Sequence, residues 1–131
     1  MKKILLIAML LATSLFAELT HVPATESFLN KNMKIIDIRT IGEWRETGIV
    51  NKSYTVVFFD ENGNYDVPKF LKEIGKIVKK DEQFAIICRT GSRTGMVGEF
   101  LSKDIGYNVI NLSGGIEKLI QEGYKPVRYM K

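Results

Sequence analysis

The single cysteine of this 131-residue chain lies where a thiol could act as a nucleophile. Residues 84–87 form an apolar, β-favouring run that ends at Cys88, and the residues from Arg93 onward have apolar side chains at helical spacing. Cys88 is therefore expected at the carboxyl end of a strand, facing the amino end of a helix. The free N–H groups and the positive dipole of such a helix end favour the thiolate, which is the nucleophilic form of cysteine.

The short polar segment between this strand and this helix is suited to holding an anion. Arg89 and Arg93 bring positive charge to its two ends, and Gly91 allows the loop to curl until successive backbone amides converge on one point. The alternative is an unreactive core residue, since free cysteine is among the most buried residue types. The arginines, the glycine and the following helix together favour a reactive Cys88.

The segment Cys88-Arg89-Thr90-Gly91-Ser92-Arg93 resembles the active-site loop of the rhodanese-like sulfurtransferases, whose pattern is Cys-x-x-Gly-x-Arg. The resemblance implies that Cys88 carries a persulfide sulfur inside the loop. Related phosphatases place five residues between the cysteine and the arginine, whereas this chain has four. A phosphatase or arsenate-type enzyme is therefore disfavoured, and a non-catalytic module that carries sulfur or binds a protein is the stronger alternative.

Two other segments resemble the same family. Asp37-x-Arg39 followed by Glu43-Trp44 looks like the first family signature, although Thr47-Gly48-Ile49 stands where the family has Gly-His-Ile, so the histidine is missing. The last segment resembles the carboxyl-terminal signature of the family, which is a Gly-Gly turn, a helix and a Gly-x-x-Pro-Val exit. Here the turn is Gly114-Gly115 and the exit is Gly123-x-x-Pro126-Val127, and Leu119 stands where the helix often has a tryptophan. The three motifs follow the family order along residues 18–131.

The resemblance implies a sulfurtransferase that moves sulfane sulfur from an anionic donor such as thiosulfate to a thiol or cyanide acceptor. In that scheme Cys88 is the nucleophile, Arg89 binds the negative charge of the donor, and Arg93 braces the loop from inside. Asp37 and Arg39 could orient the cysteine loop through charge-assisted hydrogen bonds, and a solvated ion pair at a strand end is an equal alternative. The substrate-binding set implied by the family comprises Arg89, Thr90, Gly91, Ser92, Arg93 and Thr94.

Strands that alternate with helices predict an α/β domain with a mostly parallel central sheet flanked by helices, as expected for a single rhodanese-like domain. Thr25, Thr40 and Asp66 are predicted helix N-caps, and Thr40 with Glu43 fits a capping box. Residues 70–78 predict an amphipathic helix, and Gly106 should end the helix that starts near Arg93. The predicted strands are residues 34–39, residues 54–59 with both faces buried, residues 84–87 and residues 108–112.

The first seventeen residues have the features of a secretory signal peptide. Two lysines precede an apolar stretch, and Ala17 offers a small residue at the expected cleavage site before Glu18. Residues 4–17 are shorter than the ~20 residues that a spanning helix needs, which disfavours the alternative of an uncleaved membrane anchor. We expect an exported domain of residues 18–131, located in the periplasm of a bacterium.

Composition excludes several other functions. Removal of Lys2 and Lys3 would lower the formal net charge from +4 to +2, and no basic patch with interleaved aromatic residues predicts nucleic-acid binding. Residues 60–66 resemble a calcium loop, but Tyr65 occupies the position that requires glycine. We therefore expect no metal and no cofactor. His21, the only histidine, has no acid or nucleophile near it in sequence and receives no predicted role, and the sequence does not identify a protein partner.

Overall fold

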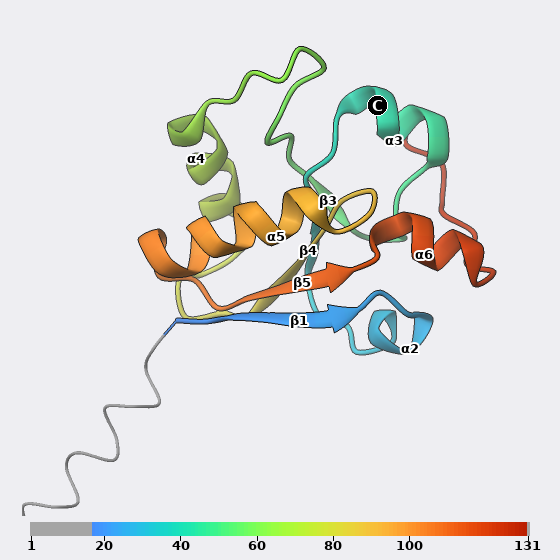
Figure 1. Cartoon of the computed structure of the whole chain (residues 1–131), viewed down its shortest axis with the longest axis horizontal. Helices are drawn as coiled ribbons and strands as arrows, with labels where there is room; N and C mark the ends of the chain where they lie inside the picture. The colour runs from blue at the N-terminus through green and yellow to red at the C-terminus, as the bar shows by residue number, and fades with distance from the viewer. Residues whose placement is uncertain (1–16, 131) are drawn as a thin grey trace, which may run out of the picture.

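The computed structural model describes residues 17–130, so the predicted signal peptide lies outside the described residues except for Ala17. The strands form one five-stranded sheet in the order β1-β5-β4-β2-β3, and every neighbouring pair is parallel (Figure 1). The predicted α/β class with a parallel central sheet is confirmed. The strands are β1 (Leu19–Pro23), β2 (Ile35–Asp37), β3 (Tyr54–Thr55), β4 (Phe84–Ile87) and β5 (Val109–Ser113).

Helices cover both faces of this sheet (Figure 1). Three of the predicted caps are confirmed: Thr25 and Asp66 each accept a backbone N–H bond, and Thr40 forms a complete capping box with Glu43. Within residues 17–130, no helix has the length and apolar composition needed to cross a bilayer. The helices are α2 (Glu26–Leu29), α3 (Ile41–Thr47), α4 (Val67–Ile77), α5 (Ser92–Glu99), the π-helix η3 (Phe100–Ile105) and α6 (Gly115–Gln121).

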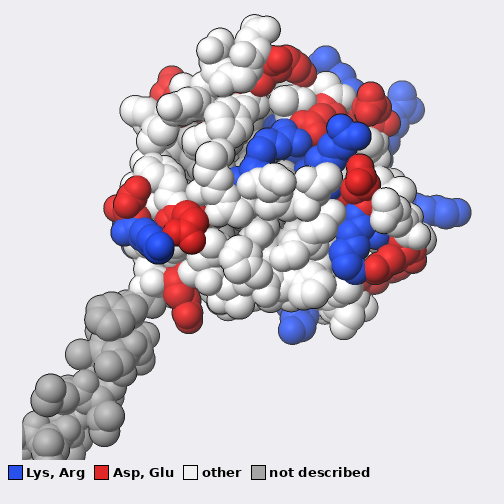
Figure 2. All heavy atoms as spheres, in the orientation of Figure 1, with Lys and Arg blue, Asp and Glu red and all other residues white. Residues whose placement is uncertain are grey.

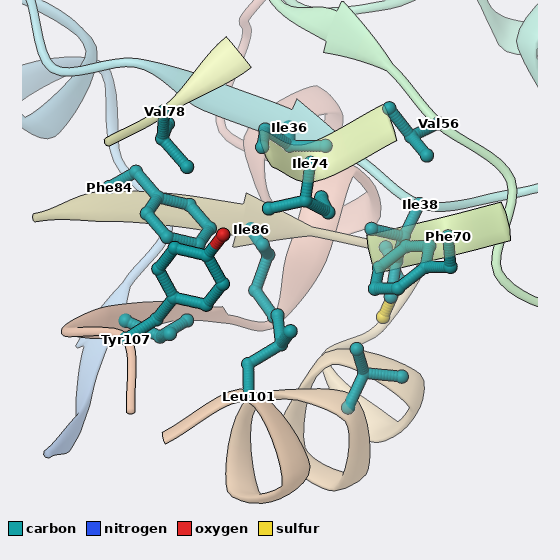
Figure 3. Close-up of a cluster of buried hydrophobic side chains, with 13 residues drawn as sticks. Ile36, Ile38, Val56, Phe70, Ile74, Val78, Phe84, Ile86, Leu101 and Tyr107 are labelled. Atoms are coloured by element: carbon teal, nitrogen blue, oxygen red, sulfur yellow. The ribbon is translucent and has the colours of Figure 1, made fainter. Parts of the chain in front are cut away.

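The core has two parts, one on each face of the sheet. On one face, side chains of α4, α5 and η3 pack against β2 and β4, and Figure 3 shows Ile74, Ile86 and Leu101 gathered in this one cluster. Phe84 and Tyr107 meet edge to face, with ring centroids 5.5 Å apart. On the other face, apolar residues of α2 and α6 pack against Ile35, Ile87 and Leu112. Cys88 belongs to the first part and therefore sits beside α5.

The prediction of a long, doubly buried strand over residues 54–59 is wrong. The regular strand that pairs with β2 contains only Tyr54 and Thr55, at the edge of the sheet, although the Val56 and Phe58 N–H groups still donate to the carbonyls of Asp37 and Ile38. Beyond Thr55 the side chains join an aromatic cluster, in which Phe58 stacks on Tyr65 and contacts the edge of Phe70 from α4. The apolar run thus reflects contacts with a helix rather than with two layers.

Two further elements differ from the prediction. Residues 19–23 form β1, a strand that the sequence did not predict, and it pairs with β5 along its whole length. The helix predicted to run to Gly106 is regular only to Glu99, after which η3 widens its last turns. Gly106 does end it, with φ +99, as predicted.

Candidate active site

Cys88 directly follows β4, and the loop after it leads into α5. Gly91 is the N-cap residue of α5 with φ +100, a left-handed conformation that glycine adopts without strain. This bend places the Gly91 N–H group 3.1 Å from the Cys88 Sγ atom, and the Thr94 Oγ1 atom lies 3.4 Å from the same sulfur. The loop therefore directs a backbone donor at the sulfur, which stabilises its anionic form.

The loop residues differ strongly in exposure. Cys88 is only 1% exposed and Thr94 is fully buried, so the sulfur lies at the base of the loop. Thr90 and Ser92 are exposed, whereas Gly91 is half-buried. The Arg89 side chain is 65% exposed, and its Nε atom lies 3.4 Å from the Glu117 carboxylate of α6. Arg89 is thus a cation at the rim of the site with only a loose partner.

Arg93 contacts α3. Its two terminal nitrogens each lie 2.7 Å from one oxygen of Glu43, which gives a bidentate ion pair between the start of α5 and the start of α3. Burial acts to raise the pKa of Glu43, but the hydrogen bonds from Arg93 and the Thr40 backbone, with the charges of Arg93 and Arg39, outweigh it and lower this pKa to about 2. The hydrogen bond with Glu43, opposed by burial, raises the pKa of Arg93. Both groups stay charged at neutral pH.

This pair predicts a specific pH dependence of stability. Because the pKa of Glu43 falls from 4.5 to about 2 on folding, its contribution is complete above pH 4.5 and is lost as the pH drops to about 2. Glu43→Gln should lower the free energy of unfolding by about 1 kcal/mol at pH 6, a value reduced for solvent screening, and by much less near pH 2.5. Urea denaturation at the two pH values measures the difference.

Glu46→Gln is the matched control, because Glu46 lies on the exposed side of the same helix. This control should change stability equally little at both pH values. A constant difference between wild type and Glu43→Gln across this range would contradict the assigned ion pair.

Asp37 and Arg39 form a buried ion pair with exposures of 0% and 1%, so the alternative of a solvated pair is wrong. Arg39 Nε and Nη2 bind the Asp37 carboxylate, and Nη1 and Nη2 each donate at 2.8 Å to the end of α3, at Thr47 Oγ1 and the Gly48 carbonyl. Among the described residues, the hydrogen bonds of this pair thus hold α3 rather than the cysteine loop. The pair reaches the loop through α3 and its ion pair between Glu43 and Arg93, and the charge of Asp37 also acts directly on Arg93, whose pKa it raises.

Gly48, at the position of the family histidine, leaves no room for a side chain. It has φ +82, and a Cβ atom there would lie 2.5 Å from the Val127 carbonyl oxygen. A side chain would therefore collide with the backbone of the exit segment, which pairs with Ile49 through an isolated antiparallel bridge. The carbonyl of this glycine instead accepts from Arg39.

The Gly114-Gly115 turn supports the cysteine loop directly, a role that the sequence did not predict. At the start of α6, the Ile116 N–H donates to the Cys88 carbonyl at 3.0 Å, and the Glu117 N–H donates to the Arg89 carbonyl at 3.1 Å. A Cβ atom on Gly115 would lie 2.3 Å from the Arg89 carbonyl oxygen. Only a glycine allows the two backbones to approach so closely.

Two more residues that the sequence did not connect to the site lie behind Cys88. Thr94 donates to the side chain of Asn111 on β5, and Asn111 in turn contacts His21 on β1. His21 is exposed, as expected for a surface residue, but it lies on a strand rather than in a turn. It is therefore linked to the cysteine through space, although it is far from it in sequence.

The surface near Arg89 is hollowed and carries mixed charge. A cavity of about 150 Å³ between α3 and α6 is lined by Arg89, Glu117, Glu43 and Ile116, among others. Two larger cavities, each of about 500 Å³, lie away from Cys88: one beside Phe58 and Phe70, the other beside Met33 and Val50. Figure 2 shows Lys and Arg interspersed with Asp and Glu on the face that it draws. Among the described residues, no group of three His, Cys, Asp or Glu side chains is placed to bind a metal ion.

A cysteine at the carboxyl end of a central parallel strand, followed by a loop that directs the Gly91 N–H group at its sulfur, defines a class of α/β proteins with a cysteine-based anion site. Residues 24–122 match the family model of the Rhodanese-like domain. The chain therefore belongs to the rhodanese-like family, as its motifs indicated.

Relatives of known sequence or structure agree with this assignment. The chain is 34% identical over 94 residues to the uncharacterized protein RP600 of Rickettsia prowazekii, covering 68% of this chain and 73% of that protein. It is 26% identical over 110 residues to the mitochondrial protein HIGH ARSENIC CONTENT 1 of Arabidopsis thaliana, covering 82% of this chain but only 64% of the Arabidopsis protein. A rhodanese-related protein of Thermoplasma volcanium has a similar structure, with a TM-score of 0.57, 28% identity and coverage of 78% and 93% of the two chains.

Proposed function

We propose that this protein is a sulfurtransferase that carries sulfane sulfur on Cys88. The observation that supports this most directly is the hydrogen bond from the Gly91 N–H group to the Cys88 Sγ atom, at 3.1 Å. A donor in this position stabilises a thiolate before the reaction and again when the thiolate leaves. Membership of the family supports the same chemistry.

The proposed reaction has two steps. The Cys88 thiolate attacks the outer sulfur of thiosulfate, the bond between the two donor sulfurs breaks, and sulfite leaves with the electron pair. The acceptor, a thiolate or cyanide, then attacks the outer sulfur of the Cys88 persulfide. The bond between the two persulfide sulfurs breaks, and the Cys88 thiolate is regenerated, so no external oxidant or reductant is needed.

The loop supplies the positive charge for this reaction. Arg89 is exposed and only loosely paired, so its guanidinium can bind the sulfonate end of the donor. Arg93 is held by Glu43 and keeps the start of α5 in place. The backbone N–H groups of Gly91 and of the first turn of α5 receive the negative charge of the persulfide.

Intact-mass spectrometry after treatment with thiosulfate tests the proposal. Because the chain has a single cysteine, a gain of one sulfur atom that is absent in Cys88→Ser identifies the site. The added sulfur should disappear when a thiol or cyanide is supplied. If a reduced, folded protein never gains sulfur, the proposed function is wrong.

The same experiment separates an enzyme from a sulfur carrier, the alternative that the sequence left open. An enzyme should complete many cycles with small-molecule donors and acceptors. A carrier should gain one sulfur atom and retain it in the presence of small thiols, releasing it only to a protein acceptor.

Arg89→Ala should raise the KM for thiosulfate by about tenfold, since a hydrogen bond to a charged group is worth about 1.5–3 kcal/mol and this site is solvated. Stability should change by less than about 0.5 kcal/mol, because the ion pair with Glu117 is exposed. Steady-state kinetics with varied thiosulfate measures the KM.

Two related variants control this prediction. Arg89→Lys keeps the charge without the planar fork and should have an intermediate KM. Glu117→Gln removes the carboxylate beside Arg89 and should leave the KM unchanged or lower it. A KM equal to that of wild type in Arg89→Ala would remove Arg89 from the donor site.

We also propose that the domain works outside the cytoplasm after removal of residues 1–17, because these residues have the pattern of a signal peptide. The amino-terminal sequence of the protein recovered from its native cell, with Glu18 as the first residue, is the measurement that checks this.

A further inference from the structure

A row of four polar side chains crosses the sheet beneath α5, starting at Cys88. The Cys88 Sγ atom lies 3.4 Å from Thr94 Oγ1, and Thr94 Oγ1 lies 2.5 Å from Asn111 Oδ1. The Asn111 Nδ2 atom lies 3.0 Å from Nδ1 of His21. Asn111 is paired in register with His21 on β1 and with Ile86 on β4, so the row follows three neighbouring strands. It ends at the exposed edge of the sheet.

The middle of this row is buried in apolar surroundings. Thr94 is fully buried and Asn111 is only 4% exposed, and the neighbours of Asn111 on β5, Ile110 and Leu112, are apolar. Within residues 17–130, the Asn111 side chain makes hydrogen bonds to Thr94 and His21. Burying an amide costs free energy unless both its oxygen and its nitrogen are hydrogen-bonded. Thr94 satisfies one of these atoms of Asn111, and His21 satisfies the other.

The single proton of the Thr94 hydroxyl ties the direction of the bonds in this row to the charge of Cys88. The Thr94 hydroxyl has one proton, and its nearer acceptor is Asn111 Oδ1 at 2.5 Å, with the Gly91 carbonyl at 3.2 Å as a second acceptor; in either case the proton points away from Cys88. Cys88 must then be the donor to Thr94, which is the arrangement of a neutral thiol. When Cys88 is a thiolate or a persulfide anion, Thr94 must donate to the sulfur instead and accept from Asn111 Nδ2. The amide must turn over, and its oxygen then requires a proton on His21 Nδ1.

We propose that His21 and Asn111 are positioning residues for Cys88, and that a proton on His21 Nδ1 stabilises the anionic sulfur through the reversed hydrogen bonds. An amide group rotates but does not pass a proton along, so the row transmits bond direction only, and the thiol proton leaves to solvent base. The inference rests on the proposed function only in taking Cys88 as the reacting group.

Two of the charged groups near the Cys88 end of the row are held in ion pairs. Arg93 beside Cys88 pairs with Glu43 of α3, and Asp37 at the end of β2 pairs with Arg39. The exposed Arg89 is the remaining cation of the cysteine loop.

The surroundings of His21 offer few other charges. Leu19, two residues earlier on β1, packs beneath Gly98 of α5, which places α5 over this part of the sheet. Of the two charged residues of α5, Arg93 pairs with Glu43, and Glu99 pairs with Lys103 of η3. β1 and β5 have no charged side chain besides His21 itself.

The state of the histidine can be read directly, because the chain has one histidine and one cysteine. At pH 9 an ordinary imidazole is neutral and an ordinary thiol is largely ionised. Long-range ¹H–¹⁵N NMR spectra should then show the imidazole proton on Nδ1 in wild type and on Nε2 in Cys88→Ser. The same nitrogen protonated in both proteins would overturn the proposal.

Alkylation of Cys88 by iodoacetamide gives a second, independent readout. At pH 7 the rate should fall about tenfold in Thr94→Val, which keeps the shape but removes the hydroxyl, and recover in Thr94→Ser. His21→Phe should lower the rate about threefold and move the rise of the pH–rate profile to higher pH. Thr20→Val, an exposed change beside His21, should leave the rate unchanged. Equal rates in wild type, Thr94→Val and His21→Phe would overturn the proposal.

These readouts use no sulfur donor, so they separate the two hypotheses. A protein that shows both effects but never gains sulfur from a donor contradicts the proposed function and supports the positioning role. If the protein transfers sulfur but its variants are alkylated at the wild-type rate, the proposed function is supported and the positioning role is contradicted.

Discussion

Replacing Cys88 with serine should abolish sulfur transfer while leaving the fold intact. The serine hydroxyl is a far weaker nucleophile than a thiolate and forms no persulfide, so turnover with thiosulfate and cyanide should fall by at least about 10³-fold. The contacts at this position can be kept, because a hydroxyl also accepts from the Gly91 N–H group and bonds with Thr94. Formation of the thiocyanate product measures the rate.

The stability of this variant decides how its inactivity is interpreted. The circular dichroism spectrum should match that of wild type, and the free energy of unfolding measured in urea should stay within about 1 kcal/mol of it, because the two side chains have nearly the same shape. A folded variant that retained a tenth of the wild-type rate would contradict catalysis through Cys88. The chain has no second cysteine that could replace it.

Gly115→Ala should have the largest effect on the structure of the site. The added Cβ atom would lie 2.3 Å from the Arg89 carbonyl oxygen and 2.6 Å from that of Cys88, and both are backbone atoms that cannot move alone. The residue also has φ +63, which costs alanine about 1–2 kcal/mol. We expect a loss of about 2–4 kcal/mol in the free energy of unfolding, together with a displaced loop and slow alkylation of Cys88.

Gly123→Ala is the matched control for this variant. Gly123 also has positive φ, at +101, but no atom lies within 4 Å of the point that its Cβ would occupy, so the change adds backbone strain without a collision. Its loss of stability should be only about 1–2 kcal/mol, and Cys88 should alkylate as fast as in wild type. If the two variants had the same stability in urea and the same alkylation rate, the close approach of α6 to the Cys88 loop would contribute neither to stability nor to the geometry of the site.

The parts of the fold that depend on neighbouring residues could be predicted from the sequence. The caps at Thr40 and Asp66 and the end of a helix at Gly106 are local, and all were predicted correctly. β1 was missed because its exposed Thr20 and His21 interrupt any apolar pattern, and only its pairing with β5 makes it a strand. The strand over residues 54–59 was predicted too long, because an apolar run does not reveal whether a sheet or a helix covers it.

The site follows the same rule. The turn at Gly91 and the position of Cys88 between strand and helix were predicted, since they involve adjacent residues. The ion pair between Arg93 and Glu43 joins residues fifty positions apart, and the contact of Asn111 with His21 joins residues ninety positions apart. No pattern in a single sequence connects such residues, so these contacts could be found only in the folded structure.

The pairing of β1 with β5 has a consequence for the order in which the parts of the Cys88 site assemble. The first strand must wait for residues 109–113, and the carbonyl of Cys88 gains its partner Ile116 only after them. A nascent chain that still lacks this carboxyl-terminal part can form neither the edge of the sheet nor the finished loop. The Cys88 loop therefore lacks its support from α6 until this carboxyl-terminal part has been synthesised, and the finished site requires the two ends of the domain to meet.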